Sequence, residues 1–505
     1  MGKTEEIRSR YILSALEDHC LNGDAYVTEE ILYKRCRDQH RSLSYEVFKA
    51  DLAEQIRLGF IHPEGSRIYA MRTWRYENSA AQSLSAILRN PTLSPAILPE
   101  KLAVNGLALC QEQRAAVGLA LSSRLSMILG GAGCGKSTLI RAIVNAVGPK
   151  RPMVLCAPTG KAARNLTMRT GLIARTVHSA LGMHPNEDFL EPVAWDHTEL
   201  VIVDEASMMT LEMLAGILHR VPSFCRVVLL GAPNQLLSVR SGNVLPDLLA
   251  LGIPCAHLKL NHRQDEDAGA LLHNVMNFSR LHRKRNLAFD QSFALHEMDA
   301  QATQKALAEE AVRRYLAGES VQVLSPYNRA GELSARSLNK IIRNRVNPLT
   351  PEKLVLANAY HENFRDGDRV MILENDRDRN CSNGDVGILH ILRTDPKNTA
   401  FCVELPDGRC PTWDDASGLE QLSLAYVLTV HKSQGSEYDT ILLPVSMGMY
   451  GMLSRNLFYT AISRARWRVI LFGDPQAVDV AVQKRLPQRK SMLVSKTRMR
   501  LEKCA

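Results

Sequence analysis

Hydrophobic positions change their spacing along the chain, and each change predicts a different kind of unit. In the first part, apolar residues recur at helical spacing over 7–18, 27–37 and 45–58. The stretch 59–71 has instead the alternation and the Pro/Gly turn of two short strands. Three helices and a hairpin predict an N-terminal winged-helix-like helical domain over residues 1–100. Such a shape suits nucleic-acid binding or protein contacts, and the pattern leaves that choice open.

Beyond residue 100, short apolar runs alternate with amphipathic helical stretches, which is the pattern of a parallel α/β sheet. The runs fall into two sets of similar size: 125–129, 152–157, 199–203 and 226–230, then 320–324, 426–430, 439–444 and 467–472. We therefore expect two tandem parallel-sheet domains, over 101–258 and 259–505.

The stretch 365–420 interrupts the second set. It has short alternating runs, turn signals at Asn383-Gly384-Asp385 and Pro406-Asp407-Gly408, and no helical period. This pattern predicts a small β-barrel inserted into the second domain, with the Asn-Gly pair as a hairpin turn that has no part in the chemistry.

A glycine-rich loop follows the first predicted strand of the first sheet. Residues 130–137 have the form Gly-x-x-x-x-Gly-Lys-Ser between a strand and a helix. The glycines let backbone N–H groups turn toward an anion, and the helix adds its positive end. Lys136 is expected to reach the β- and γ-phosphates of a nucleoside triphosphate, and Ser137 to bind Mg²⁺. The other expected contacts are Gly131, Gly133, Cys134, Gly135 and Thr138.

Catalytic side chains are predicted at the ends of later strands. Asp204 and Glu205 follow the apolar run 199–203, where Asp204 suits a Mg²⁺ ligand and Glu205 suits activation of the attacking water. Gln235 follows the next strand and suits the sensing of a γ-phosphate by a neutral amide. Arg263 and Arg464 could stabilise the charge that spreads over the γ-phosphate during hydrolysis, although either one alone would be read as a surface charge.

Two helix starts could hold a nucleic-acid strand. Thr159 and Lys161 open one helix, and His431 and Lys432 occupy the corresponding place in the second domain. A helix N-terminus with hydroxyl and amine groups is a phosphate site. The formal net charge of +9 suits a polyanionic partner without deciding the question.

Together these motifs resemble the RecD-like branch of superfamily 1B DNA helicases over about residues 105–475. They occur in the same order as the numbered helicase motifs of the family, beginning with Gln113 in the adenine-reading motif. The segments, with their motif numbers, are 130–137 (motif I), 157–163 (Ia), 176–178 (Ib), 204–207 (II), 231–236 (III), 263–264 (IV), 429–437 (V) and 459–464 (VI). The run 431–437, His-Lys-Ser-Gln-Gly-Ser-Glu, is the most specific of them.

The resemblance implies two RecA-like domains with an SH3-like barrel at 365–420. It implies ATP-driven 5′→3′ movement on single-stranded DNA, with ATP and Mg²⁺ as cofactors and single-stranded or tailed duplex DNA as partner. In the ATP site, the resemblance implies Gln113 at the adenine and Glu437 at the ribose. Lys136 and Ser137 would bind phosphate and Mg²⁺, and Asp204 and Glu205 would handle the metal and the water. The residues implied at the γ-phosphate are Gln235, Arg263 and Arg464. The implied DNA contacts are Thr159, Lys161, His178, His431 and Lys432. Residues 1–100 could bind protein partners.

The chain also departs from the family's pattern. Ala232 stands where motif III normally has Asp, and the region 182–198, where the family often places a duplex-splitting pin, is short but contains Phe189 and Trp195. These departures favour an alternative: an ATP-switched DNA-binding or assembly factor, with DNA-stimulated ATPase but little unwinding. A small-molecule P-loop kinase would explain neither the second sheet nor the run 431–437.

Composition narrows the class further. The 11 cysteines include no Cys-x-x-Cys pair, which argues against zinc and disulfide frameworks and fits reduced thiols in a cytoplasm. No signal-peptide core and no membrane-length apolar run occur, so we expect a cytoplasmic protein with no membrane partner, in a bacterial or phage-like context. The basic stretch 484–503 is expected to be a solvated helix, with an extension of the DNA path as the alternative.

Overall fold

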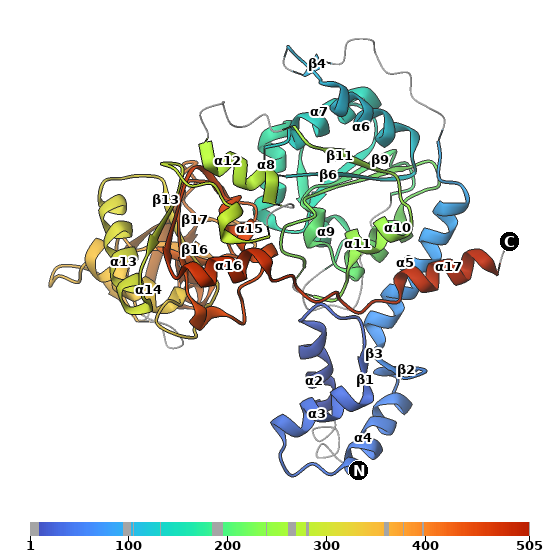
Figure 1. The fold of residues 1–505 in the computed structure, drawn as a ribbon, viewed down its shortest axis with the longest axis horizontal. Coiled ribbons are helices and arrows are strands. Elements are labelled where there is room, and N and C mark those ends of the chain that lie inside the picture. The colour runs from blue at the N-terminus through green and yellow to red at the C-terminus, as the bar shows by residue number, and fades with distance from the viewer. Residues whose placement is uncertain are drawn as a thin grey trace.

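The computed structural model (Figure 1) contains two parallel sheets covered by helices. It describes residues 10–93, 103–104, 106–131, 133–183, 195–238, 240–260, 269–278, 282–357, 363–376, 378–395 and 398–503. Among these residues, no helix is both long and apolar enough to cross a membrane.

The first sheet has six strands in the order β11-β6-β10-β9-β7-β8, all parallel. The strands are β6 (Leu125–Gly130), β7 (Met153–Ala157), β8 (Ala174–Thr176), β9 (Leu200–Val203), β10 (Arg226–Gly231) and β11 (Cys255–Leu258). The helices are α6 (Gln111–Ser122), α7 (Lys136–Val147), α8 (Gly160–Thr170), α9 (Val177–Ala180), α10 (Leu211–Arg220) and α11 (Val244–Ala250). A short hairpin, β4 (Ala103–Val104) and β5 (Leu107–Ala108), precedes them.

The second sheet has five parallel strands in the order β12-β23-β22-β13-β21. These are β12 (Phe293–Glu297), β13 (Val321–Ser325), β21 (Val427–Thr429), β22 (Tyr438–Val445) and β23 (Ala465–Gly473). The helices are α12 (Gly269–Asn277), α13 (Ala300–Leu316), α14 (Ala335–Val346), α15 (Arg455–Ile462) and α16 (Pro475–Gln483). The prediction of two parallel α/β sheets is confirmed.

Burial explains why the central strands can be predicted from the sequence. Every residue of the central strands β6, β9 and β13 is buried, as expected for parallel strands covered on both faces. The edge strand β21 is also fully buried. Because β6, β10 and β9 are parallel neighbours, their carboxyl ends meet at one edge of the sheet. That edge carries the residues of the predicted ATP site.

The insertion between α14 and β21 is a five-stranded antiparallel sheet in the order β19-β18-β17-β16-β20. Its strands are β16 (Arg369–Ile372), β17 (Val386–Asp395), β18 (Asn398–Glu404), β19 (Thr412–Trp413) and β20 (Leu422–Leu424), with β14 (Val355–Leu356) and β15 (Phe364–Arg365) beside them. Trp413 stacks on Phe401 in its own core, with ring centroids 5.2 Å apart.

The Asn-Gly hairpin prediction is wrong. Met371 of β16 pairs with Val386 of β17, so residues 372–385 all lie between this pair. Asn383 and Gly384, which has φ +93°, do form a turn, closed by the Asp385 N–H donating to the Ser382 carbonyl oxygen at 3.0 Å, but this turn lies at the end of the long loop and does not join two paired strands. The loop is long because part of it contacts α8 of the first sheet, through Ser382 and Asp385.

The N-terminal region has the predicted helices and hairpin. Its elements are α2 (Arg10–Cys20), β1 (Val27–Thr28), α3 (Glu29–Gln39), α4 (Tyr45–Arg57), β2 (Ile61–Glu64), β3 (Arg67–Ala70) and α5 (Met71–Arg89), with strand order β1-β3-β2. The helix predicted at 27–37 begins later, at Glu29, because Val27 pairs with Ile68 of β3. The long α5 then packs against α10, so this region shares a core with the first sheet (Figure 1).

The expectation of a solvated C-terminal helix is wrong. From α16 the chain crosses to the first sheet, where α17 (Leu493–Glu502) packs along α5 (Figure 1). Leu493, Lys496 and Thr497 are buried. The basic residues are placed by specific partners: Arg489 donates to the carbonyl oxygen of Gly242 at 2.8 Å, and Lys496 faces acidic side chains of the N-terminal region.

Candidate nucleotide and nucleic-acid sites

The glycine-rich loop leaves β6 and enters α7 with its lysine folded inward. Gly133 and Gly135 have φ angles of +82° and +75°, which residues with a Cβ rarely adopt. Lys136 Nζ donates to the carbonyl oxygens of Gly130 and Gly131, at 2.8 Å each. A Cβ on Gly131 would lie 3.0 Å from Tyr459 Oη. Helix α15 of the second sheet therefore reaches the loop of the first.

Two carboxylates follow β9, beside this loop. Asp204 Oδ1 accepts from the backbone N–H of Glu205 at 2.8 Å. Burial, then the nearby Glu205 carboxylate, raises the pKa of Asp204 to about 6. A divalent cation would relieve both effects, so the residues fit Mg²⁺ at Ser137 and Asp204. No cluster of three or more His, Cys, Asp or Glu side chains fit to hold a metal occurs in the described residues.

Gln235 joins the two sheets at the catalytic edge. With its amide nitrogen toward Glu205, the orientation that satisfies both amide atoms, it donates to Glu205 Oε2 at 3.0 Å. It also donates to Ser207 Oγ at 3.1 Å, and its oxygen accepts from an Arg464 guanidinium nitrogen at 2.8 Å. Arg464 is buried and its Nε donates to the carbonyl oxygen of Thr460. Three predicted catalytic residues, Glu205, Gln235 and Arg464, are thus directly connected.

All five predicted DNA contacts line one cavity of about 820 Å³ between the sheets. They are Thr159, Lys161, His178, His431 and Lys432. Burial lowers the pKa of both histidines and of Lys432. The imidazoles are therefore neutral at pH 7, and they suit hydrogen bonding more than charge pairing.

The antiparallel sheet inserted between α14 and β21, here called the inserted unit, closes this cavity from one side. Asn375, Asn383 and Gly384 line it, and Lys161 Nζ donates to the carbonyl oxygen of Gly384 at 3.3 Å. Arg164 of α8 holds the same loop through Asp385 at 2.5 Å. The loop that contains Asn-Gly is therefore a wall of the cavity.

Two parts of the chain match known protein families. Residues 108–291 match the AAA domain family, and residues 424–472 match the UvrD-like helicase C-terminal domain. The ATP-dependent RecD2 DNA helicase of Deinococcus radiodurans is 33% identical over 442 residues. The match covers 86% of this chain and 59% of that protein. Over most of its length the chain is therefore similar to RecD-like helicases of superfamily 1.

Other relatives of this RecD-like chain are more distant. The RecBCD enzyme subunit RecD of Mycolicibacterium smegmatis is 29% identical over 470 residues, covering 83% of this chain and 80% of that protein. A crystal structure of Bacteroides Pif1 bound to single-stranded DNA is 19% identical with a TM-score of 0.48, covering 76% of this chain and 95% of that one. That likeness is too low to bear on function.

Some predicted residues of the RecD-like site are not joined to the rest. Gln113 is buried, and its Oε1 accepts from the backbone N–H of Cys110 at 3.2 Å, which caps α6. Its contact with adenine stays a prediction. Arg263 and Phe189 lie outside the described residues, whereas Trp195 is buried in the core of the first sheet.

Sequence reasoning missed Arg169 at the end of α8. Its guanidinium donates to Ser137 Oγ and to Glu437 Oε1, at 3.2 Å each. It thereby places Glu437, from the second domain, beside the phosphate loop. No motif marks an arginine at the last turn of a helix, and its distance in sequence from Glu437 hides the contact.

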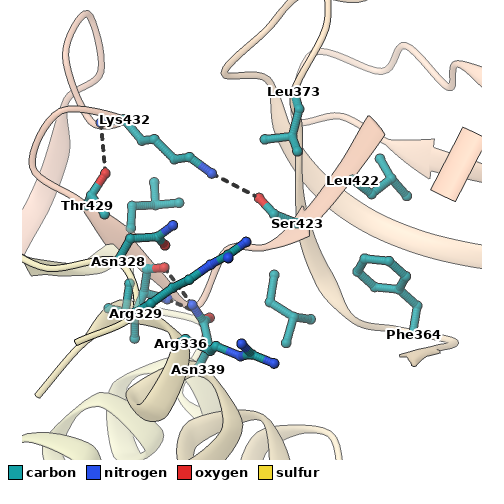
Figure 2. Close-up of a pocket in the computed structure, with 14 residues that line it drawn as sticks. Asn328, Arg329, Arg336, Asn339, Phe364, Leu373, Leu422, Ser423, Thr429 and Lys432 are labelled. Carbon is teal, nitrogen blue, oxygen red and sulfur yellow. Dashed lines mark hydrogen bonds between the residues drawn. The ribbon is translucent and has the colours of Figure 1, made fainter. Parts of the chain in front are cut away.

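A second cavity, of about 350 Å³, lies between the second sheet and the inserted unit (Figure 2). Arg329, Arg336 and Lys432 lie on its polar side, and Phe364 and Leu422 lie on the opposite side (Figure 2). Lys432 lines both cavities and donates through Nζ to Ser423 Oγ at 3.5 Å. Lys432 therefore lies between the two cavities.

Proposed function

We propose that this RecD-like chain is an ATP-dependent DNA helicase that moves 5′→3′ on single-stranded DNA. The observation that carries the proposal is the Glu205–Gln235–Arg464 connection. It joins the expected water-activating carboxylate on one sheet to the expected arginine on the other. A change in the state of the γ-phosphate would therefore change how the two sheets are held together.

The chemistry follows from the positions of these side chains. Glu205 would accept a proton from the attacking water, and Arg464, together with Arg263, would stabilise charge on the γ-phosphate oxygens. Lys136 would leave its two carbonyl partners to bind the phosphates. Ser137 and Asp204 would hold Mg²⁺, which would supply positive charge at the phosphates.

Movement would arise because the same two sheets form the walls of the 820 Å³ cavity. Thr159 and Lys161 come from the first sheet's helix start, and His431 and Lys432 follow β21 of the second. Closing and opening the ATP site would shift one pair relative to the other along a bound strand. Alternating grip by the two pairs would make the shift directional.

The finer architecture is part of the same proposal. The antiparallel sheet at 369–424 would be an SH3-like barrel, and residues 1–100 a winged-helix-like domain that could contact proteins. Support for the activity comes from the Deinococcus relative's name, although this chain spans only 59% of that protein. The natural substrate would be single-stranded or tailed duplex DNA.

A strand-displacement assay tests the proposal. Purified protein with ATP and Mg²⁺ should separate a duplex that carries a 5′ tail and leave a duplex with a 3′ tail intact. ATP turnover should rise when single-stranded DNA is added, and turnover that ignores DNA would refute the motor. Wild-type turnover that rises with DNA without strand displacement would instead support the ATP-switched assembly factor, which the buried Ala232 in motif III favours.

A further inference from the structure

Three residues outside every helicase motif line the edge of the 820 Å³ cavity. They are Arg72, Glu212 and Arg240. Arg72 is the second residue of α5, so the N-terminal region contributes directly to the cavity wall. Glu212 lies in the first turn of α10, and Arg240 precedes α11.

The carboxylate holds the two arginines near each other. Glu212 Oε1 accepts from Tyr76 Oη at 2.9 Å and lies 3.5 Å from an Arg72 guanidinium nitrogen. Its other oxygen lies 4.0 Å from Arg240. The Glu212 side chain is only 11% exposed, whereas those of Arg72 and Arg240 are 64% and 70% exposed.

These ion pairs are loose enough to be exchanged. On the side of the 820 Å³ cavity, one carboxylate faces two guanidiniums, so that side has an excess of positive charge. Both guanidiniums are exposed and lie 3.5 and 4.0 Å from the carboxylate, so one of them can turn toward another anion while Glu212 keeps Tyr76 and the other arginine. A nucleic-acid phosphate arriving from the cavity would be such an anion, and arginine can bind it with two parallel hydrogen bonds.

Acidic residues beside the two arginines limit the path that a bound strand can take. A neighbouring cavity of about 400 Å³ shares these three residues and adds Glu17 and Asp18 of α2. Those carboxylates would repel a phosphate backbone. A strand that passes the two arginines would therefore turn to solvent and would not continue beneath α2.

We propose that Arg72 and Arg240 bind backbone phosphates of single-stranded DNA at the mouth of the cavity. The N-terminal region then acts as part of the DNA path, through the start of α5. This inference rests on the proposed function, because it requires a strand in the cavity.

The salt dependence of binding tests it on the full-length chain. Fluorescence anisotropy with a labelled oligo(dT), without nucleotide, gives the slope of log K against log salt. Removing one arginine that binds a phosphate should reduce the magnitude of this slope by about 0.7. Arg72→Ala and Arg240→Ala should each show that reduction, and Arg72→Lys should recover most of the wild-type slope.

Arg75→Ala is the matched control. Arg75 is on the same helix, three residues further on, and does not line the cavity. Wild-type slopes for Arg72→Ala and Arg240→Ala, or an equal fall in Arg75→Ala, would overturn the inference. A wild-type protein that binds no DNA would refute the proposed function first, so the two failures are distinguishable.

Discussion

Lys496 is buried between two carboxylates, and its replacement should destabilise the junction of α17 with α5. Its Nζ lies 3.1 Å from Glu77 Oε2 and 3.2 Å from Glu64 Oε2. The Lys496 and Glu77 side chains are 5% and 0% exposed. We predict that Lys496→Met lowers the free energy of unfolding by about 3–5 kcal/mol, because it leaves a buried carboxylate without its cation.

The distance supports this magnitude. Two unit charges 3.1 Å apart attract by about 5 kcal/mol at an effective dielectric constant of about 20. The Glu64 carboxylate adds to this attraction but is 34% exposed, so solvent screens it. Methionine keeps most of the aliphatic volume, so the loss reports the charge and not the packing.

A double-mutant cycle with Glu77→Gln isolates the ion pair. Urea unfolding measures the global effect, and hydrogen exchange at the Met492 amide measures the local one, because that N–H donates to Glu77 Oε1 at 2.8 Å. The double variant should lose less free energy of unfolding than the sum of the two single variants' losses, because neither residue of the pair is then left charged without its partner. A loss below about 1 kcal/mol for Lys496→Met, or strictly additive losses, would refute the reasoning.

Three further predictions concern single positions. Lys136→Ala should reduce ATP turnover by roughly 100-fold or more while anisotropy still detects DNA binding, and turnover within about tenfold of wild type would contradict its phosphate role. Burial raises the pKa of Asp247 to about 6, so the folded state holds the proton more tightly and stability rises as pH falls through 6. Asp247→Asn should therefore stabilise the fold by up to about 3 kcal/mol at pH 7.5, and urea titrations should show this gain shrinking toward pH 4.5; a constant gain would contradict it. Gly473→Ala should destabilise the second sheet by about 2–4 kcal/mol, because φ is +132° and the new Cβ would meet the Val445 carbonyl oxygen at 2.1 Å. An unchanged urea midpoint would disprove that last prediction.

The sequence is informative where one local signal suffices. The central strands are predictable because every residue of β6 and β9 is buried, which produces a continuous apolar run. The edge strands β8 and β11 escape prediction because they are only partly buried and carry polar residues. The Asn-Gly prediction is wrong because the turn pattern cannot reveal that the loop before β17 contacts another domain.

The candidate sites divide in the same way. Residues within motifs, such as Gln235 and Arg464, could be predicted because each follows a strand or ends a helix in a recognisable run. Arg169 and Arg72 could not, because each takes its place from a contact with a residue far away in the sequence. Neither position has a local pattern that distinguishes it from an ordinary surface arginine.

The crossing of the C-terminal segment also constrains the order in which the protein can be assembled during synthesis. Leu493 belongs to the same hydrophobic core as Leu84 and Leu214, and the backbone N–H of Met492 bonds to Glu77, 415 positions earlier. At about 5–20 residues per second, a ribosome needs roughly 20–80 s to cover that interval. During this time α5 can pack against α10 but not against α17, and the Glu77 carboxylate does not have Lys496 beside it. The packing site of Leu493 and the Glu77 carboxylate therefore stay uncovered by α17 until the last residues of the chain emerge.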